Sequence, residues 1–306
     1  MDLLNRKQDI RKLLESPGTS PELKRKLKLV ESVRTFAIQQ MAFTDNEGYT
    51  GYVDLGRPYV TMVVTAAAPL ELKAHQWCYW FVGCQEYRGY FDESDARSYA
   101  EKMEQQKLDV SVRITTAYST LGWMDDPITG PMLRRESGEL LETILHELVH
   151  ATVFVPNQPE FNEGAARFIG QEAAVRFHRS VALRTRVSED RQIAAEILAF
   201  RDRVAALYAH TEAPADAAAE RSTLEGAFRK QLASLPLTSR DPASFAARAR
   251  LNDACLALSG TYAADDARLE RLLGELDGDL VRFIERLREA AEAEDPREDF
   301  FRASGT

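Results

Sequence analysis

The sequence predicts an α+β protein with a small sheet in its N-terminal half and a mainly helical remainder. β-Branched and aromatic residues gather at Tyr59–Thr65, and apolar residues alternate with polar ones at Val110–Thr115, as expected for strands. From residue 136 onward, apolar residues recur at helical spacing. The 306 residues are 44% hydrophobic and 28% charged, which is ordinary for a globular protein that buries a core.

Residues 1–45 are expected to form helices, and residues 46–135 a mixed region that contains the sheet. Ser20 is suited to cap a helix and Pro21 to occupy its first turn. A further helix is predicted at Glu93–Gln106, between the two strands. The turn-rich passage from Gly122 to Pro131 then leads into the helical part.

Residues 136–299 are predicted to be helical, and we expect the whole chain, 1–306, to form one functional unit. Apolar periodicity marks these helices: Leu140–Val153, Phe161–Arg179, Ala194–Tyr208, Phe245–Leu258 and Leu269–Leu287. The alanine-rich segment Ala213–Ala219 contains a proline and is expected to separate two helices. The last residues, from Phe300, are expected to be a frayed tail.

Charge and hydropathy exclude two classes of partner. The net charge is −9, from 48 acidic and 39 basic residues, and no basic block appears. Nucleic acid is therefore not an expected partner, because its backbone binds to clustered Lys and Arg. No apolar run reaches the 18 residues of a transmembrane helix, so no transmembrane segment is expected in this chain. The charged start, Met1–Leu14, is unlike a signal peptide.

The three cysteines are Cys78, Cys84 and Cys255. Cys78 and Cys84 lie close together around an expected turn. They can form a disulfide loop in an oxidising compartment or remain two free thiols, and the residues alone leave both alternatives open. Cys255 lies in an apolar helical stretch and is expected in the core.

One predicted helix carries a metal-binding pattern. His146, Glu147 and His150 form H-E-x-x-H within Leu140–Val153. Residues four apart lie on the same face of a helix, so both imidazoles can reach one ion. Glu147 then lies beside the ion without binding it, where its carboxylate can accept a proton from the activated water.

A zinc site of this kind needs a third protein ligand and leaves the fourth position for water. Glu163 is the expected third ligand, because it begins a second helix after the turn-forming segment Val155–Pro159. No third histidine follows at the metzincin spacing, and no H-x-x-E-H occurs. The sequence therefore predicts one Zn²⁺ per chain, held by His146, His150 and Glu163.

The sequence resembles the bacterial family of predicted aminopeptidases of the gluzincin type. The resemblance covers about residues 3–265, and weaker matches are Asn252 and Tyr262. Its motifs are Asp54–Tyr59, Trp77-Cys78, Gly83-Cys84, Tyr87–Phe91, Ala117–Trp123, Asp125–Pro127, His146–His150 and Phe161–Glu163. The resemblance implies a zincin-like fold, aminopeptidase activity on a peptide or protein substrate, and residence in the cell envelope or periplasm after removal of a leader. In that compartment the disulfide Cys78–Cys84 would be favoured; the alternative location is the cytoplasm.

The sequence departs from the gluzincin pattern at Arg167. Many gluzincins have an acidic residue four positions after the glutamate ligand, and it orients a histidine ligand. Glu142, Glu172 or a backbone carbonyl would have to take this role here. The Gly-x-Met-x-Asn signature of well-characterised aminopeptidases is also missing.

Two tyrosines are candidates for stabilising the oxyanion of the reaction. Tyr262, on a downstream helical segment, is the first choice, and Tyr118, beside a turn after a predicted strand, is the second. The alternative for both is a tyrosine packed at the edge of the core. The strand Asp109–Thr116 is either an edge strand that binds an extended peptide or an ordinary internal strand.

Together these features predict hydrolysis of peptide bonds, with Glu147 as the general base. An aminopeptidase also needs a carboxylate that binds the free amine of its substrate, and the candidates are Glu86, Asp125 and Asp126. The alternatives are an endopeptidase of the same fold that acts on a protein partner, and a non-catalytic zinc-binding protein of the cell envelope.

Overall fold

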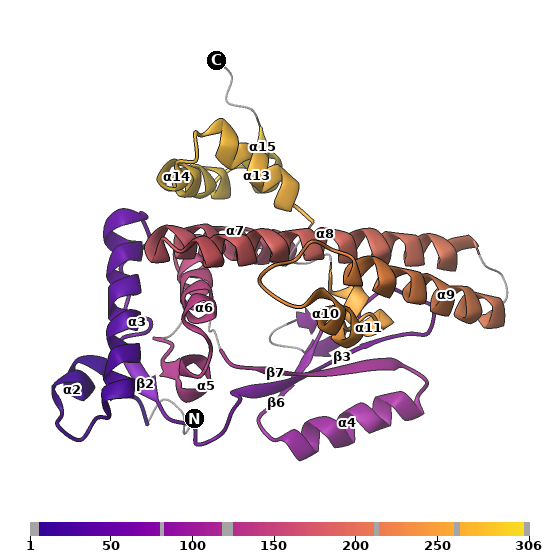
Figure 1. Ribbon diagram of the computed structural model, residues 1–306, viewed down its shortest axis with the longest axis horizontal. Coiled ribbons are helices and arrows are strands. Elements are labelled where there is room, and N and C mark those ends of the chain that lie inside the picture. Colours follow the sequence, from indigo (N-terminus) through magenta and orange to yellow (C-terminus); the bar gives the residue numbers. More distant parts are fainter. Residues whose placement is uncertain (1–5, 80–82, 118–124, 211–213, 260–263, 303–306) are drawn as a thin grey trace. The chain divides into compact units, whose positions relative to one another are not determined.

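The computed structural model describes residues 6–79, 83–117, 125–210, 214–259 and 264–302, and Figure 1 shows their helices and strands. The predicted α+β class is confirmed. The chain divides into two compact units that alternate along the sequence. The first comprises Met1–Val60, Thr116–Leu183 and Asp265–Thr306, and the second Thr61–Thr115 and Arg184–Ala264. No helix in the described ranges is long and apolar enough to cross a membrane.

The first unit begins with helices α2 (Ile10–Glu15) and α3 (Pro21–Gln40). Helix α3 starts where the sequence predicts: the Ser20 hydroxyl accepts a hydrogen bond from the Leu23 amide at 3.2 Å. Strands from before and after these helices form a small sheet in the order β1-β2-β8: β1 (Gln8–Asp9), β2 (Gly51–Val53) and β8 (Ile128–Thr129). The short helix α5 (Gly130–Leu133) leads on to the two helices that carry the candidate metal ligands.

These two helices are α6 (Ser137–His150) and α7 (Pro159–His178), near the positions predicted for them. Three C-terminal helices complete the unit: α13 (Asp266–Glu275), α14 (Leu280–Ala291) and α15 (Pro296–Phe301). The prediction of one continuous helix from Leu269 to Leu287 is wrong. Gly278 has a φ of 76°, and its amide donates to the Leu273 carbonyl, which ends α13.

The prediction of a frayed tail from Phe300 is also wrong for this residue. Phe300 is fully buried, with its ring centroid 5.7 Å from Phe161 of α7 and 5.2 Å from Phe283 of α14. Phe168 of α7 packs against Phe283 at 5.6 Å. The C-terminal helices thus bury their aromatic side chains against α7 and help to fix its position.

The second unit contains an antiparallel sheet with β3 (Thr61–Ala67) between β6 (Arg88–Tyr90) and β7 (Asp109–Thr115). Its two faces carry different helices, α4 (Glu93–Gln105) and α11 (Asp253–Ala257), which lie on opposite sides in Figure 1. On one face Ala66 packs with Met103 of α4. On the other face the Cys255 thiol of α11 donates to the Ser111 hydroxyl at 3.2 Å.

Helices α8 (Val181–His210), α9 (Pro214–Ala233) and α10 (Pro242–Arg248) complete the helical part, and Phe200 of α8 stacks on Phe228 of α9 at 4.3 Å. The predicted separation of two helices near Ala213–Ala219 is confirmed, since α8 ends at His210 and α9 begins at Pro214. Its extent is wrong, because Pro214 occupies the first turn of α9 and the residues up to Ala219 are helical. The single helix predicted at Phe245–Leu258 is two helices. The Arg229 guanidinium donates hydrogen bonds to the carbonyl oxygens of Ala246 and Ala249, which are free at the end of α10.

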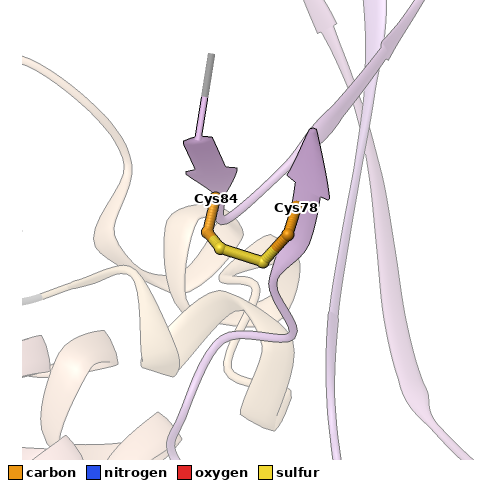
Figure 2. Close-up of a disulfide and its surroundings, with 2 residues drawn as sticks. All are labelled: Cys78 and Cys84. Carbon is orange, nitrogen blue, oxygen red and sulfur yellow. A yellow bond between two sulfur atoms is a disulfide. The ribbon is translucent and has the colours of Figure 1, made fainter. Parts of the chain in front are cut away.

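A short hairpin of the second unit carries a disulfide. Strands β4 (Trp77–Tyr79) and β5 (Gly83–Gln85) pair so that Cys78 lies directly opposite Cys84, and their sulfur atoms are bonded (Figure 2). Of the two alternatives that the residues left open, a disulfide and two free thiols, the structure has the disulfide. Cys255 is a free thiol.

We predict that Glu189 of α8 makes the stability of the second unit sensitive to acid. Its carboxylate accepts hydrogen bonds from the amides and hydroxyls of Thr238 and Ser239. Burial raises the pKa of Glu189, but these bonds outweigh it and lower the pKa to about 2 from an ordinary 4.5. Because the pKa is lower in the folded than in the unfolded state, the ionised carboxylate stabilises the folded protein above about pH 4.5. This contribution to the free energy of unfolding is lost as the pH falls from there toward 2.

Glu189→Gln should therefore unfold at lower urea concentration than the wild type at pH 6, and this difference should shrink as the pH falls below 4.5. Urea unfolding followed by circular dichroism at several pH values measures it. Glu275→Gln, on an exposed turn of α13, is the matched control. A difference that does not depend on pH would contradict the prediction.

Candidate metal centre

Helix α6 presents His146, Glu147 and His150 from a rigid support. Its opposite face is buried in the core through apolar side chains: Leu140, Leu141, Ile144, Leu145 and Leu148. His150, at the end of the helix, is only 4% exposed. The Nε2 atoms of His146 and His150 lie 3.1 Å apart, so both rings point to one place.

Helix α7 brings Glu163 to the same place, and Asn162 fixes the loop before it. The Asn162 amide oxygen accepts from the Val155 amide at 2.9 Å, and its nitrogen donates to the Val155 carbonyl at 2.7 Å. Asn162 is only 6% exposed, so these bonds are shielded from water. They close the turn between α6 and α7 and fix the start of α7, on which Glu163 is the fifth residue.

The distances among the three side chains fit a zinc site. Glu163 Oε2 lies 3.4 Å from His146 Nε2, and Glu163 Oε1 lies 3.4 Å from His150 Nε2. Atoms held tetrahedrally about 2.0–2.1 Å from one zinc ion are about 3.3 Å from each other. The donor set of two imidazoles and a carboxylate also suits zinc. Glu147 offers a further carboxylate oxygen within 4.8 Å of both histidines.

The electrostatics of the site follow from these contacts. Burial raises the pKa of Glu163, but hydrogen bonds from His146 and His150 outweigh it and lower the pKa to about 2. Burial lowers the pKa of His146, whereas Glu163 and Glu147 raise it, and the net pKa lies above its ordinary value. The site thus concentrates negative charge that attracts a cation.

Gly170 sets the distance between the two helices. It lies two turns after Glu163, on the same face of α7. A Cβ atom at this position would lie 2.9 Å from the His146 amide nitrogen and 3.1 Å from the Glu142 carbonyl oxygen. Because these are backbone atoms of α6, no side chain can move aside. The small residue lets the glutamate of α7 reach the histidines of α6.

Arg167, which stands where many gluzincins have an acidic residue, has a partner in the C-terminal part of the chain. Arg167 forms an ion pair with Asp266 of α13, and both side chains are mostly buried. Arg167 lies close enough to His146 to lower its pKa. Asp266 therefore balances a cation beside the candidate metal ligands. Glu172, one of the suggested substitutes, pairs with Arg176 on its own helix at 2.5 Å.

Other residues singled out in the sequence are placed differently. Tyr118 and Tyr262 lie outside the described residues, so their suggested role stays a prediction. Asp126 is buried, and Asp125 is exposed. Neither Gly170 nor Asp266 was predicted from the sequence. A glycine within a predicted helix was the one available signal, because it destabilises a helix unless close packing requires it.

Strand β7 forms an edge of the sheet among the strands that the structure describes. The Asn252 side chain donates to the Val110 carbonyl at 3.2 Å, and Arg250 donates to the Val112 carbonyl at 2.9 Å. A peptide added along this edge would have to displace both side chains. Strand addition over this stretch is therefore disfavoured.

The second unit also contains a cleft of about 700 Å³, lined by Lys107, Asp109, Tyr208, Arg221 and Asp253 among others. Three of its polar side chains contact one another: Tyr208 donates to Asp253 at 2.7 Å, and Arg221 lies 3.4 Å from Asp253. The candidate metal ligands are not among its lining residues.

Two histidines and a glutamate that converge from two packed helices of an α+β fold form a candidate metal site. A second glutamate lies beside it. The sequence model of a family described as "putative aminopeptidase" matches residues 1–300, and the chain belongs to this family. Membership supports a peptidase. No curated protein and no solved structure matches the chain significantly.

We predict that Gly170→Ala weakens zinc binding, because the added methyl group separates α6 from α7 and moves Glu163 away from the histidines. The loss should be on the order of 10–100-fold, as for other changes that disturb the support of metal ligands. Competition with a chromophoric chelator measures the affinity. Gly226→Ala in α9 is the control, since its methyl group meets nothing within 4 Å. Equal affinities in Gly170→Ala and the wild type would refute the prediction.

Asp266→Asn should also weaken zinc binding, by about tenfold, because it leaves the Arg167 cation unbalanced near His146. The double variant Arg167→Gln/Asp266→Asn restores the net charge and should recover most of the affinity. Titration of the metal-free variants with zinc in a calorimeter measures both. If the double variant binds as weakly as Asp266→Asn, packing rather than charge is responsible.

Proposed function

We propose that the protein is a zinc-dependent peptidase of the gluzincin type, in which His146, His150 and Glu163 hold one zinc ion. The observation that carries the proposal is the position of the Glu163 carboxylate, 3.4 Å from the Nε2 atoms of both histidines. These three residues come from helices whose approach is fixed by packed backbone at Gly170. The spacing of the donor atoms supports zinc, as argued above.

A bound zinc ion supplies a Lewis acid that polarises the scissile carbonyl and lowers the pKa of a water molecule. Glu147 provides the proton transfer. It follows His146 on α6, so its carboxylate lies beside the ligands while Glu163 contacts both imidazoles. Glu147 takes a proton from the attacking water and later delivers it to the leaving amine. Tyr262, or else Tyr118, is proposed to donate to the oxyanion.

The substrate we favour is a peptide with a free N-terminus, and family membership supports this choice. Hydrolysis of matched peptides with free and acetylated N-termini tests it. An aminopeptidase cleaves only the free form, because its site binds the amine. Cleavage of both forms at internal bonds would instead identify an endopeptidase of the same fold.

The disulfide supports a location in the cell envelope or periplasm. Disulfides persist in oxidising compartments and are rare in the cytosol. Cys78 and Cys84 are both exposed, so cellular reductants would have access to their bond. Thiol labelling of protein recovered from intact cells measures the redox state. A reduced pair would contradict this location.

We predict that Glu147→Gln retains about one zinc per chain and loses most of its hydrolytic activity. The amide keeps the shape of the side chain but cannot accept the proton, and loss of a general base costs about 10²–10⁴-fold in rate. Zinc content by atomic emission and a peptide digest read by mass spectrometry measure the two effects.

His146→Gln is the matched variant that should lose zinc and activity together. An unaffected Glu147→Gln variant would exclude the mechanism. Wild-type protein that binds no zinc would exclude the metal site.

A further inference from the structure

Tyr49 is a bulky residue in an unusual conformation close to the candidate metal centre. Its φ is 61°, in the left-handed region that aromatic residues rarely adopt, and the residue is only 3% exposed. Such strain persists where the surroundings fix the conformation, and it is often associated with functional sites. Sequence analysis gave no reason to single this residue out.

Hydrogen bonds hold the turn that contains Tyr49. Its amide donates to the Asp126 carbonyl at 2.8 Å. Nearby, Arg34 of α3 donates to the Gly48 carbonyl at 3.0 Å, and the Gly48 amide donates to the Asn46 side chain at 2.8 Å. The turn is thus tied to α3 and to the segment before β8.

The same segment is also tied to the end of α6. The Thr44 amide donates to the Thr152 hydroxyl at 3.1 Å, and this hydroxyl donates to the Leu148 carbonyl at 2.7 Å. Leu148 lies directly after Glu147 on α6. The backbone around Tyr49 is therefore held in a fixed relation to the helix that carries the proposed general base.

The Tyr49 hydroxyl is buried and has no hydrogen-bond partner among the described residues. Burial raises the pKa of Tyr49 well above its ordinary value, and the carboxylates of Glu147 and Asp126 raise it further. The phenol therefore stays protonated and can act as a donor. Two carboxylates lie close enough to influence it, and both are acceptors.

We propose that Tyr49 is a positioning residue that holds the Glu147 carboxylate through one water molecule bound by its buried hydroxyl. One carboxylate oxygen then accepts from this water, and the other faces the metal site. The inference rests on the proposed role of Glu147 as general base.

The variant Tyr49→Phe distinguishes this positioning role from a purely structural role of Tyr49. A buried hydroxyl without a partner destabilises the fold, so its removal would leave the protein equally or more stable, with unchanged kinetics. A hydroxyl that holds Glu147 contributes a favourable interaction that Phe cannot replace. The two carboxylates Glu147 and Asp126 can be separated, because each can be replaced on its own.

The first experiment is a double-mutant cycle on metal-free protein, with Tyr49→Phe, Glu147→Gln and the combined variant. Urea unfolding gives the free energy of unfolding of each. We expect the effects not to be additive, with the double variant differing from the sum of the single ones. A second cycle, which combines Tyr49→Phe with Asp126→Asn instead of Glu147→Gln, should show weaker coupling. This measurement needs neither zinc nor substrate, so it is independent of whether the proposed function is correct.

The second experiment is steady-state hydrolysis of a peptide substrate by the zinc-loaded enzyme. Tyr49→Phe should lower kcat about tenfold or more while leaving KM and zinc content unchanged, because a misdirected base slows the chemical step. Tyr52→Phe is the matched control, since Tyr52 lies on β2 and the charge that affects its phenol comes first from Asp54. It should leave kcat unchanged.

Additive free energies in the Tyr49–Glu147 cycle would overturn the inference. So would a Tyr49→Phe enzyme with the kcat of the wild type. If the wild type hydrolyses no peptide at all but the cycle still shows coupling, the proposed function fails while the water-mediated link between Tyr49 and Glu147 stands.

Discussion

The close packing of α6 against α7 is the constraint on which the rest of the site depends. At Gly170 the backbone of α7 comes so near the backbone of α6 that a Cβ atom would lie 2.9 Å from the backbone nitrogen of His146. This approach brings Glu163 within 3.4 Å of both histidines. Ligands divided between two helices can bind one metal ion only if the distance between the helices is fixed to a few tenths of an ångström.

Several distant segments support this packing. Asn162 closes the loop that begins α7, and Phe300, near the end of the described chain, packs on Phe161 of the same helix. Asp266 balances the charge of Arg167 beside His146. The turn at Tyr49 is tied to the other helix, α6, through Thr44 and Thr152. The C-terminal helices and the N-terminal turn therefore contribute to one centre, although they are far from it in sequence.

The sequence was sufficient for features that depend on local spacing. The H-E-x-x-H pattern placed His146 and His150 on one face of a helix, and the structure finds their Nε2 atoms 3.1 Å apart. Strand β7 and the start of α3 were also predicted, from alternation and from a helix cap. Features that depend on contacts across the chain were missed. Nothing local to Asp266 indicates its pairing with Arg167, and the apolar pattern around Phe245–Leu258 gave no sign that Arg229 ends α10.

The most direct test of the central claim is an anomalous difference map, recorded at the zinc absorption edge from crystals grown with zinc. The account predicts one strong peak per chain that lies within bonding distance, about 2.0–2.2 Å, of His146 Nε2, His150 Nε2 and a carboxylate oxygen of Glu163. Glu147 should lie beside the peak without bonding to it. A peak elsewhere, or none between α6 and α7, would contradict the assignment of these three residues as metal ligands.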